Sequence, residues 1–320
     1  MRYIIYGAGG IGGTIAARLF QHGHDVVAIC RGAHLEACRA SGLTLRDPDE
    51  TVTLPVPVVG SPAEIEWRGD EAALVTMKTQ DTQAALLALR DAAGDVPVVC
   101  AQNGVANERM ALRVFSRVYG MVVWMPTTHL TPGEVIAQST PITGVLHAGC
   151  YPTGTDHLIG MVCHDLTEST FRSDPDPAIM RLKYSKLTTN LANAVQGMCG
   201  DAAAGDLVRR LRDEAAQVYE AAGVDYAQGD EFAERAKGPT LKEVPGEGNR
   251  GGGSTWQSLT RGSGLETDYL NGEIVLLGAL HGVPTPFNRM VQMAAAEAAR
   301  LGRKPGDYSV EELMRRVEMS

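Results

Sequence analysis

Three polar side chains recur at helical spacing in the second half of the chain, and their types suit acid–base chemistry. Lys186, Asn190 and Asn193 are separated by four and three residues, which places them on one face of a helix predicted over residues 178–198. Amides bind substrate oxygens, and an ammonium group donates a proton. The alternative is a solvent-exposed polar face. Lys183, one turn earlier, competes as the proton donor.

Glycines near the N-terminus indicate a cofactor for this chemistry. A strand predicted at Tyr3–Tyr6 runs into Gly7-Ala8-Gly9-Gly10-Ile11-Gly12, followed by a helix over Thr14–His22 and a second strand over Val26–Cys30. The first glycine permits a turn, the second lets backbone N–H groups approach a pyrophosphate, and the last lets the helix pack on the strand. The pattern predicts a dinucleotide-binding βαβ unit, with a chance glycine turn as the alternative. We expect cofactor contacts from Gly7, Gly9, Gly10, Ile11 and Gly12.

The residue after the second strand discriminates between two dinucleotides. Arg31 stands where an NAD-binding fold usually carries an acid that bonds the ribose 2′-OH. A guanidinium instead offers a planar fork of donors to a 2′-phosphate. Arg31 therefore predicts NADP(H) and a reductive direction, with an exposed loop residue as the alternative.

Two further polar residues follow predicted buried strands. Lys78 comes after Ala72–Met77, and Asn103 comes after Val96–Ala101. Ligands of open α/β sheets bind beyond the carboxyl ends of the strands, so we expect both residues near the nicotinamide. The alternatives are a solvated strand end for Lys78 and an Asn-Gly turn for Asn103.

Composition excludes several classes of partner. The net charge of −9, with no basic tract, argues against nucleic acid and against anionic membranes. The chain has no apolar run of the roughly 18 residues that a membrane span needs. It enters its first strand at once, with no room for a signal peptide, so we expect a cytoplasmic protein with reduced cysteines. The six cysteines and eight histidines show no ligand spacing, and we predict no metal site.

The pattern of elements changes near Pro175. Strands and helices alternate up to that point, which predicts a mostly parallel sheet with helices on both faces. Beyond it the chain is almost purely helical. We therefore predict an α/β fold with a Rossmann-type dinucleotide-binding domain over residues 1–174 and an all-helical substrate domain over residues 175–320. Later strands are predicted at 118–126, 135–139, 142–147 and 170–172, further helices at 157–163, 203–222, 230–237, 265–281 and 286–301, and a glycine-rich loop at 238–254.

Together these motifs resemble the ketopantoate reductase (2-dehydropantoate 2-reductase) family. Its most specific block here is Glu266-Thr267-Asp268-Tyr269-Leu270-Asn271-Gly272, and the resemblance covers most of the chain. The other matching residues are the glycine loop, Arg31, Lys78, Gln102-Asn103-Gly104, Lys186 with Asn190, Ser254 and His281-Gly282-Val283-Pro284.

The resemblance implies a reaction and roles for individual residues. It implies NADPH-dependent reduction of a 2-oxo acid to a 2-hydroxy acid in a cleft between the domains, with 2-dehydropantoate and pantothenate biosynthesis as the leading assignment. Lys186 would be the general acid. Asn103, Asn190 and Ser254 would contact substrate or cofactor, and Glu266 would hold the substrate or the lysine. A homodimer is left open as the assembly.

One position departs from the family pattern, and two other functions remain open. The second asparagine, expected eight residues after the lysine, stands one residue earlier, at Asn193 instead of Ala194. Such a shift rotates a helical side chain by about 100°. The alternative functions are a 3-hydroxy acid or opine-type dehydrogenase and a non-catalytic NADPH-sensing protein. The intact set of Lys186, Asn190, Ser254 and Glu266 speaks against a sensor, which needs no proton donor.

Overall fold

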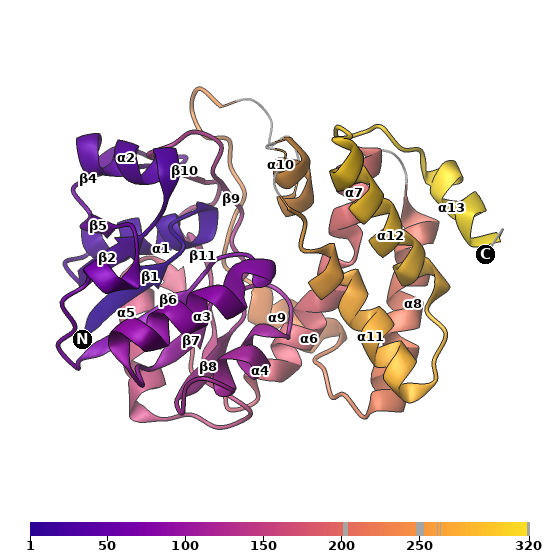
Figure 1. Ribbon diagram of the computed structural model, residues 1–320, viewed down its shortest axis with the longest axis horizontal. Coiled ribbons are helices and arrows are strands. Elements are labelled where there is room, and N and C mark those ends of the chain that lie inside the picture. Colours follow the sequence, from indigo (N-terminus) through magenta and orange to yellow (C-terminus); the bar gives the residue numbers. More distant parts are fainter. Residues whose placement is uncertain (201–203, 248–252, 261, 263, 319–320) are drawn as a thin grey trace. The chain divides into compact units, whose positions relative to one another are not determined.

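The chain forms two compact units in a computed structural model that describes residues 1–200, 204–247, 253–260, 262 and 264–318 (Figure 1). The first unit comprises residues 1–103, 107–183 and 228–248, and the second comprises residues 104–106, 184–227 and 249–320. The first unit is a mixed α/β structure and the second is helical, so the predicted fold class is confirmed. The chain enters the second unit at residue 184, stays there for 44 residues, and returns to the first unit at residues 228–248.

A seven-stranded sheet forms the centre of the first unit. Its strand order is β12-β8-β7-β6-β1-β2-β5, and every pair is parallel except β12 with β8. In that order the strands are Ala148–Cys150, Val118–Met121, Val98–Cys100, Glu71–Val75, Arg2–Tyr6, Asp25–Ile29 and Val58–Val59. The carboxyl ends of β1, β6 and β7 consequently meet at one edge, which is where ligands of such sheets bind.

Both faces of this sheet are covered by helices. Tyr3 and Ile5 of β1 belong to one buried apolar cluster, while Ile4 belongs to another. This alternation follows from the two-residue period of a strand. The helices of the unit are α1 (Gly10–Gln21), α2 (Gly32–Ser41), α3 (Thr79–Ala93), α4 (Asn107–Leu112), α5 (His157–Glu168), α9 (Gly229–Ala236) and the 3₁₀ turn η1 (Pro62–Glu64). Residues of α1 and α5 line the first cluster, and residues of α3 and α4 line the second.

Two smaller sheets complete the first unit. One has the order β4-β3-β10-β9, and the other pairs β11 with β13. Their strands are β3 (Leu43–Arg46), β4 (Thr51–Leu54), β9 (Thr127–Thr128), β10 (Glu134–Ala137), β11 (Gly144–Val145) and β13 (Phe171–Arg172). Residues 43–59 thus hold three short strands, β3, β4 and β5. The strand predicted at 142–147 shrinks to two residues, and the helix predicted from Thr14 begins four residues earlier, at Gly10.

The second unit is a bundle of helices, and its described residues contain no strand. It contains the C-terminal part of α6 (Ile179–Asn190) and the helices α7 (Ala192–Cys199), α8 (Gly205–Ala222), α10 (Ser254–Thr260), η2 (Thr267–Tyr269), α11 (Asn271–His281), α12 (Pro286–Leu301) and α13 (Val310–Glu318). Helices α8, α11 and α12 pack on one another. None of the helices in the described ranges is long and apolar enough to cross a bilayer.

Two predicted helices are interrupted in this unit. The helix predicted over 178–198 divides at Leu191, whose carbonyl accepts a hydrogen bond from Asn271 Nδ2 at 3.2 Å. A side chain that bonds a helix carbonyl competes with the helix's own ladder. The helix predicted over 265–281 begins only at Asn271, because Leu270 takes non-helical dihedrals (φ −112°, ψ −87°). In the predicted loop 238–254, residues 248–252 lie outside the described part of the chain.

Candidate active site

The glycine loop has the backbone geometry that its sequence predicts. Gly7 lies in the left-handed region with φ 108°, where a side chain would be strained, and a Cβ there would come within 2.9 Å of Met77 N. A Cβ at Gly12 would collide with Thr76 Oγ1 and with the Gly7 carbonyl. Glycine at 12 therefore lets α1 pack directly on the end of β1.

The same loop leaves room for a ligand. A Cβ built at Gly9 would meet no atom within 4 Å among the described residues. Gly9 is also the N-cap of α1, and without a side chain it cannot cap the first-turn N–H groups. Uncapped amides at a helix N-terminus form a ready anion site. These features fit the pyrophosphate of a dinucleotide.

The end of β2 supports this loop and presents Arg31. The carbonyl of Ile29, the last residue of β2, accepts hydrogen bonds from Gly7 N at 3.0 Å and Ala8 N at 3.1 Å. Arg31 follows two residues later as the exposed N-cap of α2. Its guanidinium is therefore carried on a segment that is bonded directly to the loop.

Buried hydrogen bonds join the segments that carry Lys78 and Asn103. Gln102 Nε2 donates to Met77 O and to Thr82 Oγ1, each at 2.7 Å, and Asn107 Nδ2 donates to Asn103 O at 3.1 Å. Thr82 Oγ1 donates in turn to Asn107 Oδ1 at 3.0 Å. The network ties the end of β6 to the end of β7.

Lys78 and Asn103 flank this network, and both are half-buried. Lys78 is the N-cap of α3, and Asn103 lies three residues beyond β7. The structure thus brings their backbones to one edge of the sheet, beside the carboxyl end of β1.

Lys183 is held in a buried ion pair. Its Nζ lies 2.7 Å from Glu108 Oε1, and the two side chains are 2% and 0% exposed. The same ammonium donates to Gln102 O at 2.8 Å and Met121 O at 3.1 Å. It therefore fastens the ends of β7 and β8 to α4. A lysine engaged in this way contributes to the stability of the fold.

Lys186 and Asn190 share α6, whereas Asn193 lies on α7. Lys186 is half-buried, and its Nζ lies 3.4 Å from Thr189 Oγ1. Asn190, the last residue of α6, is 3% exposed. Leu191, between the two helices, has helical dihedrals (φ −58°, ψ −27°), and its N–H donates to Leu187 O at 3.2 Å.

The start of α10 lies against Asn193. A Cβ at Gly253 would come 4.0 Å from Asn193 Oδ1, and a Cβ at Gly197 would come 2.8 Å from Thr255 Cγ2. Glycine at 197 therefore lets α10 pack closely on α7. The predicted site residue Ser254 is the first residue of α10, directly after Gly253.

Glu266 is half-buried and immediately precedes η2, where its carbonyl accepts from Tyr269 N at 2.9 Å. In the same sequence block, Asn271 is fully buried and bonds Leu191 O and, at 3.0 Å, Asn288 Oδ1. The specific block therefore contains at least one structural residue, which orients the α6–α7 junction relative to α11.

Sequence reasoning missed three constellations of side chains. They are the Lys183–Glu108 ion pair, the network of Gln102, Thr82 and Asn107, and a cluster of Cys30, His34 and Cys38. Only the last had a local signal, the four-residue spacing of His34 and Cys38 on one helix face. The other two join residues that are at least 20 positions apart.

Two sequence models of one family match most of the chain. The model described as ketopantoate reductase PanE/ApbA matches residues 3–152, and the model of the C-terminal part of the same protein matches residues 178–298. The chain belongs to the ketopantoate reductase family. Members of the ketopantoate reductase family are oxidoreductases acting on CH–OH groups, and this chain is one of them.

Similar proteins align over more than nine-tenths of this ketopantoate reductase family member. A 2-dehydropantoate 2-reductase of Caulobacter vibrioides is 28% identical over 310 residues, covering 93% of this chain and 98% of that protein. The crystal structure of a ketopantoate reductase from Ralstonia eutropha is 25% identical, with a TM-score of 0.78 over 94% of this chain and 99% of that one. A D-mandelate dehydrogenase complex with NADH and anilino(oxo)acetate shares the fold, at 19% identity and a TM-score of 0.79 over 94% and 99% of the two chains.

Proposed function

We propose that this protein reduces a 2-oxo acid to a 2-hydroxy acid with NADPH, and that 2-dehydropantoate is the substrate. The observation that carries the proposal is the match of both family models, which together extend from residue 3 to residue 298. The Caulobacter relative, which is named for this reaction, aligns over 93% of the chain. No observation in the described residues favours an opine-type dehydrogenase or a sensor.

The glycine loop and Arg31 would hold the cofactor. The uncapped N–H groups at the start of α1 suit the pyrophosphate, and the space beside Gly9 admits it. Exposed Arg31 would bind the 2′-phosphate that distinguishes NADPH from NADH. When bound, the reduced nicotinamide supplies hydride to the carbonyl carbon of the substrate. Lys78 and Asn103, at the ends of β6 and β7, are proposed to contact its nicotinamide half.

Lys186 is proposed as the general acid. Hydride addition leaves negative charge on the carbonyl oxygen, and Lys186 would stabilise that charge and then donate its proton there. The burial of Lys183 against Glu108 supports this choice between the two lysines of α6. Asn103, Asn190, Asn193, Ser254 and Glu266 are proposed as polar contacts that orient the 2-oxo acid.

The test compares Lys186→Ala with a matched control, Lys304→Ala, which alters an exposed lysine of the same unit. Oxidation of NADPH is followed by absorbance against a panel of 2-oxo acids that includes 2-dehydropantoate. We expect Lys186→Ala to lower kcat by about 10²–10⁴ with little change in NADPH affinity, and the control to match the wild type. Near-normal turnover by Lys186→Ala would refute the assignment of the acid. A wild-type protein that oxidises NADPH with no member of the panel would refute the reaction.

A further inference from the structure

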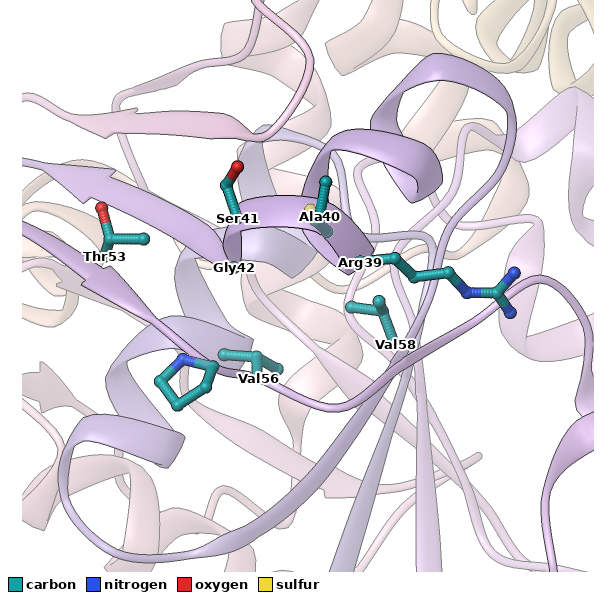
Figure 2. A pocket seen from close by; sticks show the side chains of 9 residues that line it. Arg39, Ala40, Ser41, Gly42, Thr53, Val56 and Val58 are labelled. Atoms are coloured by element: carbon teal, nitrogen blue, oxygen red, sulfur yellow. The ribbon is translucent and has the colours of Figure 1, made fainter.

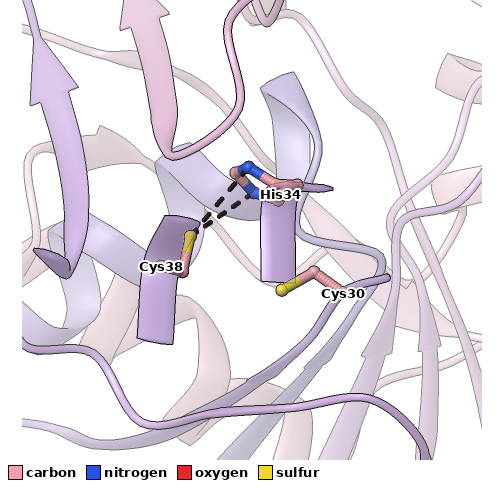
Figure 3. Close-up of side chains that lie close together, drawn as sticks. All are labelled: Cys30, His34 and Cys38. Carbon is pink, nitrogen blue, oxygen red and sulfur yellow. Dashed lines mark hydrogen bonds between the residues drawn. The ribbon is translucent and has the colours of Figure 1, made fainter. Parts of the chain in front are cut away.

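Two cysteines and a histidine gather at the junction of β2 and α2. Cys30 follows the last residue of β2, while His34 and Cys38 lie one turn apart on α2 (Figure 3). Their sulfur and nitrogen atoms lie within 4.8 Å of one another, and all three residues are buried. Cys38 Sγ is 3.8 Å from His34 Nε2 and 3.9 Å from Nδ1.

The hydrogen bonds of His34 argue against a cation at this cluster. Gly133 N donates to Nδ1 at 2.9 Å, so that the ring proton sits on Nε2, which donates to Ala8 O at 2.8 Å. A cation could take either nitrogen only by breaking one of these bonds. The chemistry of the cluster therefore rests with its two thiols.

Cys38 differs from the other five cysteines in its environment. A hydrogen bond from Cys30 is the main cause that lowers the pKa of the Cys38 thiol, against the opposing effect of burial. For the remaining cysteines the environment raises the pKa: burial is the main cause at Cys100, Cys150, Cys163 and Cys199, and the hydrogen bond to Cys38 is the main cause at Cys30. Since the thiolate is the reactive form, Cys38 is the most nucleophilic of the set.

A pocket is lined in part by Cys38. It has a volume of about 550 Å³ and is lined by residues at the C-terminal end of α2 and in the segment from β4 to β5, including Cys38, Ser41, Thr53 and Val56 (Figure 2). The residues that line this pocket include Cys38 and not Cys30, although both residues are buried, at 4% and 6% exposed respectively.

We propose that Cys38 is an oxidation site for a hydroperoxide that enters through this pocket, and that Cys30 resolves the product into a reversible disulfide. The Cys38 thiolate attacks the peroxide, the O–O bond breaks, and the leaving alkoxide or hydroxide takes up a proton, so that Cys38 becomes a sulfenic acid. The Cys30 sulfur then attacks the Cys38 sulfur and displaces hydroxide, which leaves as water with the Cys30 proton. The net reaction converts two thiols and one hydroperoxide into a disulfide, an alcohol or water, and a further water.

The geometry permits this bond after a modest movement. A disulfide needs its sulfurs about 2.05 Å apart, and the two Sγ atoms start within 4.8 Å of each other. We expect the gap to close by new side-chain rotamers at Cys30 and Cys38 together with a shift of the backbone that carries Cys30.

The disulfide would disturb the glycine loop. Ile29, next to Cys30, holds Gly7 and Ala8 through its carbonyl, and His34 holds the Ala8 carbonyl. Drawing Cys30 toward Cys38 strains these bonds and displaces the neighbouring Arg31. Loss of one or two net hydrogen bonds corresponds to about a tenfold rise in the Kd of NADPH. This consequence rests on the proposed function, whereas disulfide formation does not.

The first experiment maps the bond without reference to activity. Reduced full-length protein is treated with hydrogen peroxide, alkylated with iodoacetamide and analysed by intact mass and peptide mapping. We expect two fewer alkylated thiols and a Cys30–Cys38 peptide pair that dithiothreitol reverses. Cys30→Ser should leave a dimedone-reactive sulfenic acid at Cys38, and Cys38→Ala should abolish the reaction. The matched control, Cys150→Ser, alters a more exposed cysteine and should behave as the wild type.

Several results would overturn the proposal. Oxidation that maps first to Cys150, or the absence of a Cys30–Cys38 pair, would show that Cys38 is not the reactive thiol. Purified protein that carries stoichiometric zinc and resists peroxide until a chelator is added would show a metal site instead. In a second experiment, calorimetry compares NADPH binding to reduced and oxidised protein. A disulfide with unchanged affinity would refute the coupling, and failure of both forms to bind NADPH would refute the proposed cofactor while leaving the oxidation site intact.

Discussion

Lys183→Met should destabilise the first unit, because Lys183 is the buried partner of Glu108. Methionine keeps the unbranched apolar stem of lysine and removes its charge. The fully buried Glu108 carboxylate then loses the ammonium group that lay 2.7 Å from its Oε1. The carbonyls of Gln102 and Met121 each lose a donor as well.

The expected loss is a large share of the stability of the protein. Removing one partner of a buried ion pair costs about 3–5 kcal/mol. Each of the two carbonyls that lose a donor costs about 1 kcal/mol more, and part of that cost is already contained in the value for the ion pair. We therefore expect the free energy of unfolding to fall by about 4 kcal/mol, against a typical total of about 5–15 kcal/mol. With a urea m-value of about 2 kcal/mol/M, the midpoint falls by about 2 M.

The assay is urea unfolding at neutral pH, followed by circular dichroism and by tryptophan fluorescence, since Trp67 and Trp124 both lie in the first unit. Lys186→Met is the matched control, one turn away on α6, and should shift the midpoint little while losing turnover. Adding Glu108→Gln to Lys183→Met should recover about 0.5–3 kcal/mol, because the unpaired charge is gone.

An unchanged midpoint in Lys183→Met would refute the structural role of the ion pair. A large loss of kcat in that variant at undiminished stability would show that Lys183, and not Lys186, is the proton donor.

Two further predictions concern the dinucleotide site and the pH dependence of stability. Arg31→Asp should lower the ratio of kcat/KM for NADPH to kcat/KM for NADH by about tenfold to hundredfold, because a charge-assisted hydrogen bond to phosphate contributes that much. Arg39→Asp, a control at an exposed arginine of α2, should leave the ratio unchanged. An unchanged ratio in Arg31→Asp would refute the 2′-phosphate role. Burial lowers the pKa of His147, whose Nε2 donates to Arg235 O at 2.9 Å and whose Nδ1 accepts from Asp174 N at 2.9 Å. The neutral His147 side chain therefore contributes to stability above the ordinary histidine pKa of about 6.5, and this contribution is lost as pH falls below that value. The urea midpoints measured at pH 7.5 and pH 5.5 should consequently differ more in the wild type than in His147→Gln. An equal pH dependence in the two proteins would contradict this account.

The dinucleotide loop was predictable because its requirements are local. The positive φ at Gly7 favours glycine by itself, and a Cβ at Gly12 would already collide with the carbonyl of Gly7, five residues earlier. The largest error in this βαβ unit was the start of α1, which lies at Gly10 and was predicted at Thr14. That error arose because glycine is a poor helix former in isolation, whereas packing on β1 here favours the helical turn.

The polar stripe on α6 shows where periodicity stops being informative. Helical spacing assigned Lys183, Lys186, Asn190 and Asn193 to one continuous helix. In the structure α6 ends at Asn190 and α7 begins at Ala192, and the carbonyl of Leu191 between them accepts a hydrogen bond from Asn271, 80 positions along the chain. No pattern within the helix contains that information.

By itself, the sequence determined the fold class, the family and the loop expected to bind the dinucleotide. Backbone conformation, alternation in strands and glycine packing obey rules that act over a few residues, and these rules can be read along the chain. Only the tertiary structure decided which of two lysines, three residues apart and chemically identical, is buried in an ion pair. It also decided which of six cysteines lines a pocket beside a second thiol. Burial and charge pairing arise from contacts between segments distant in sequence, and they set what a side chain can do.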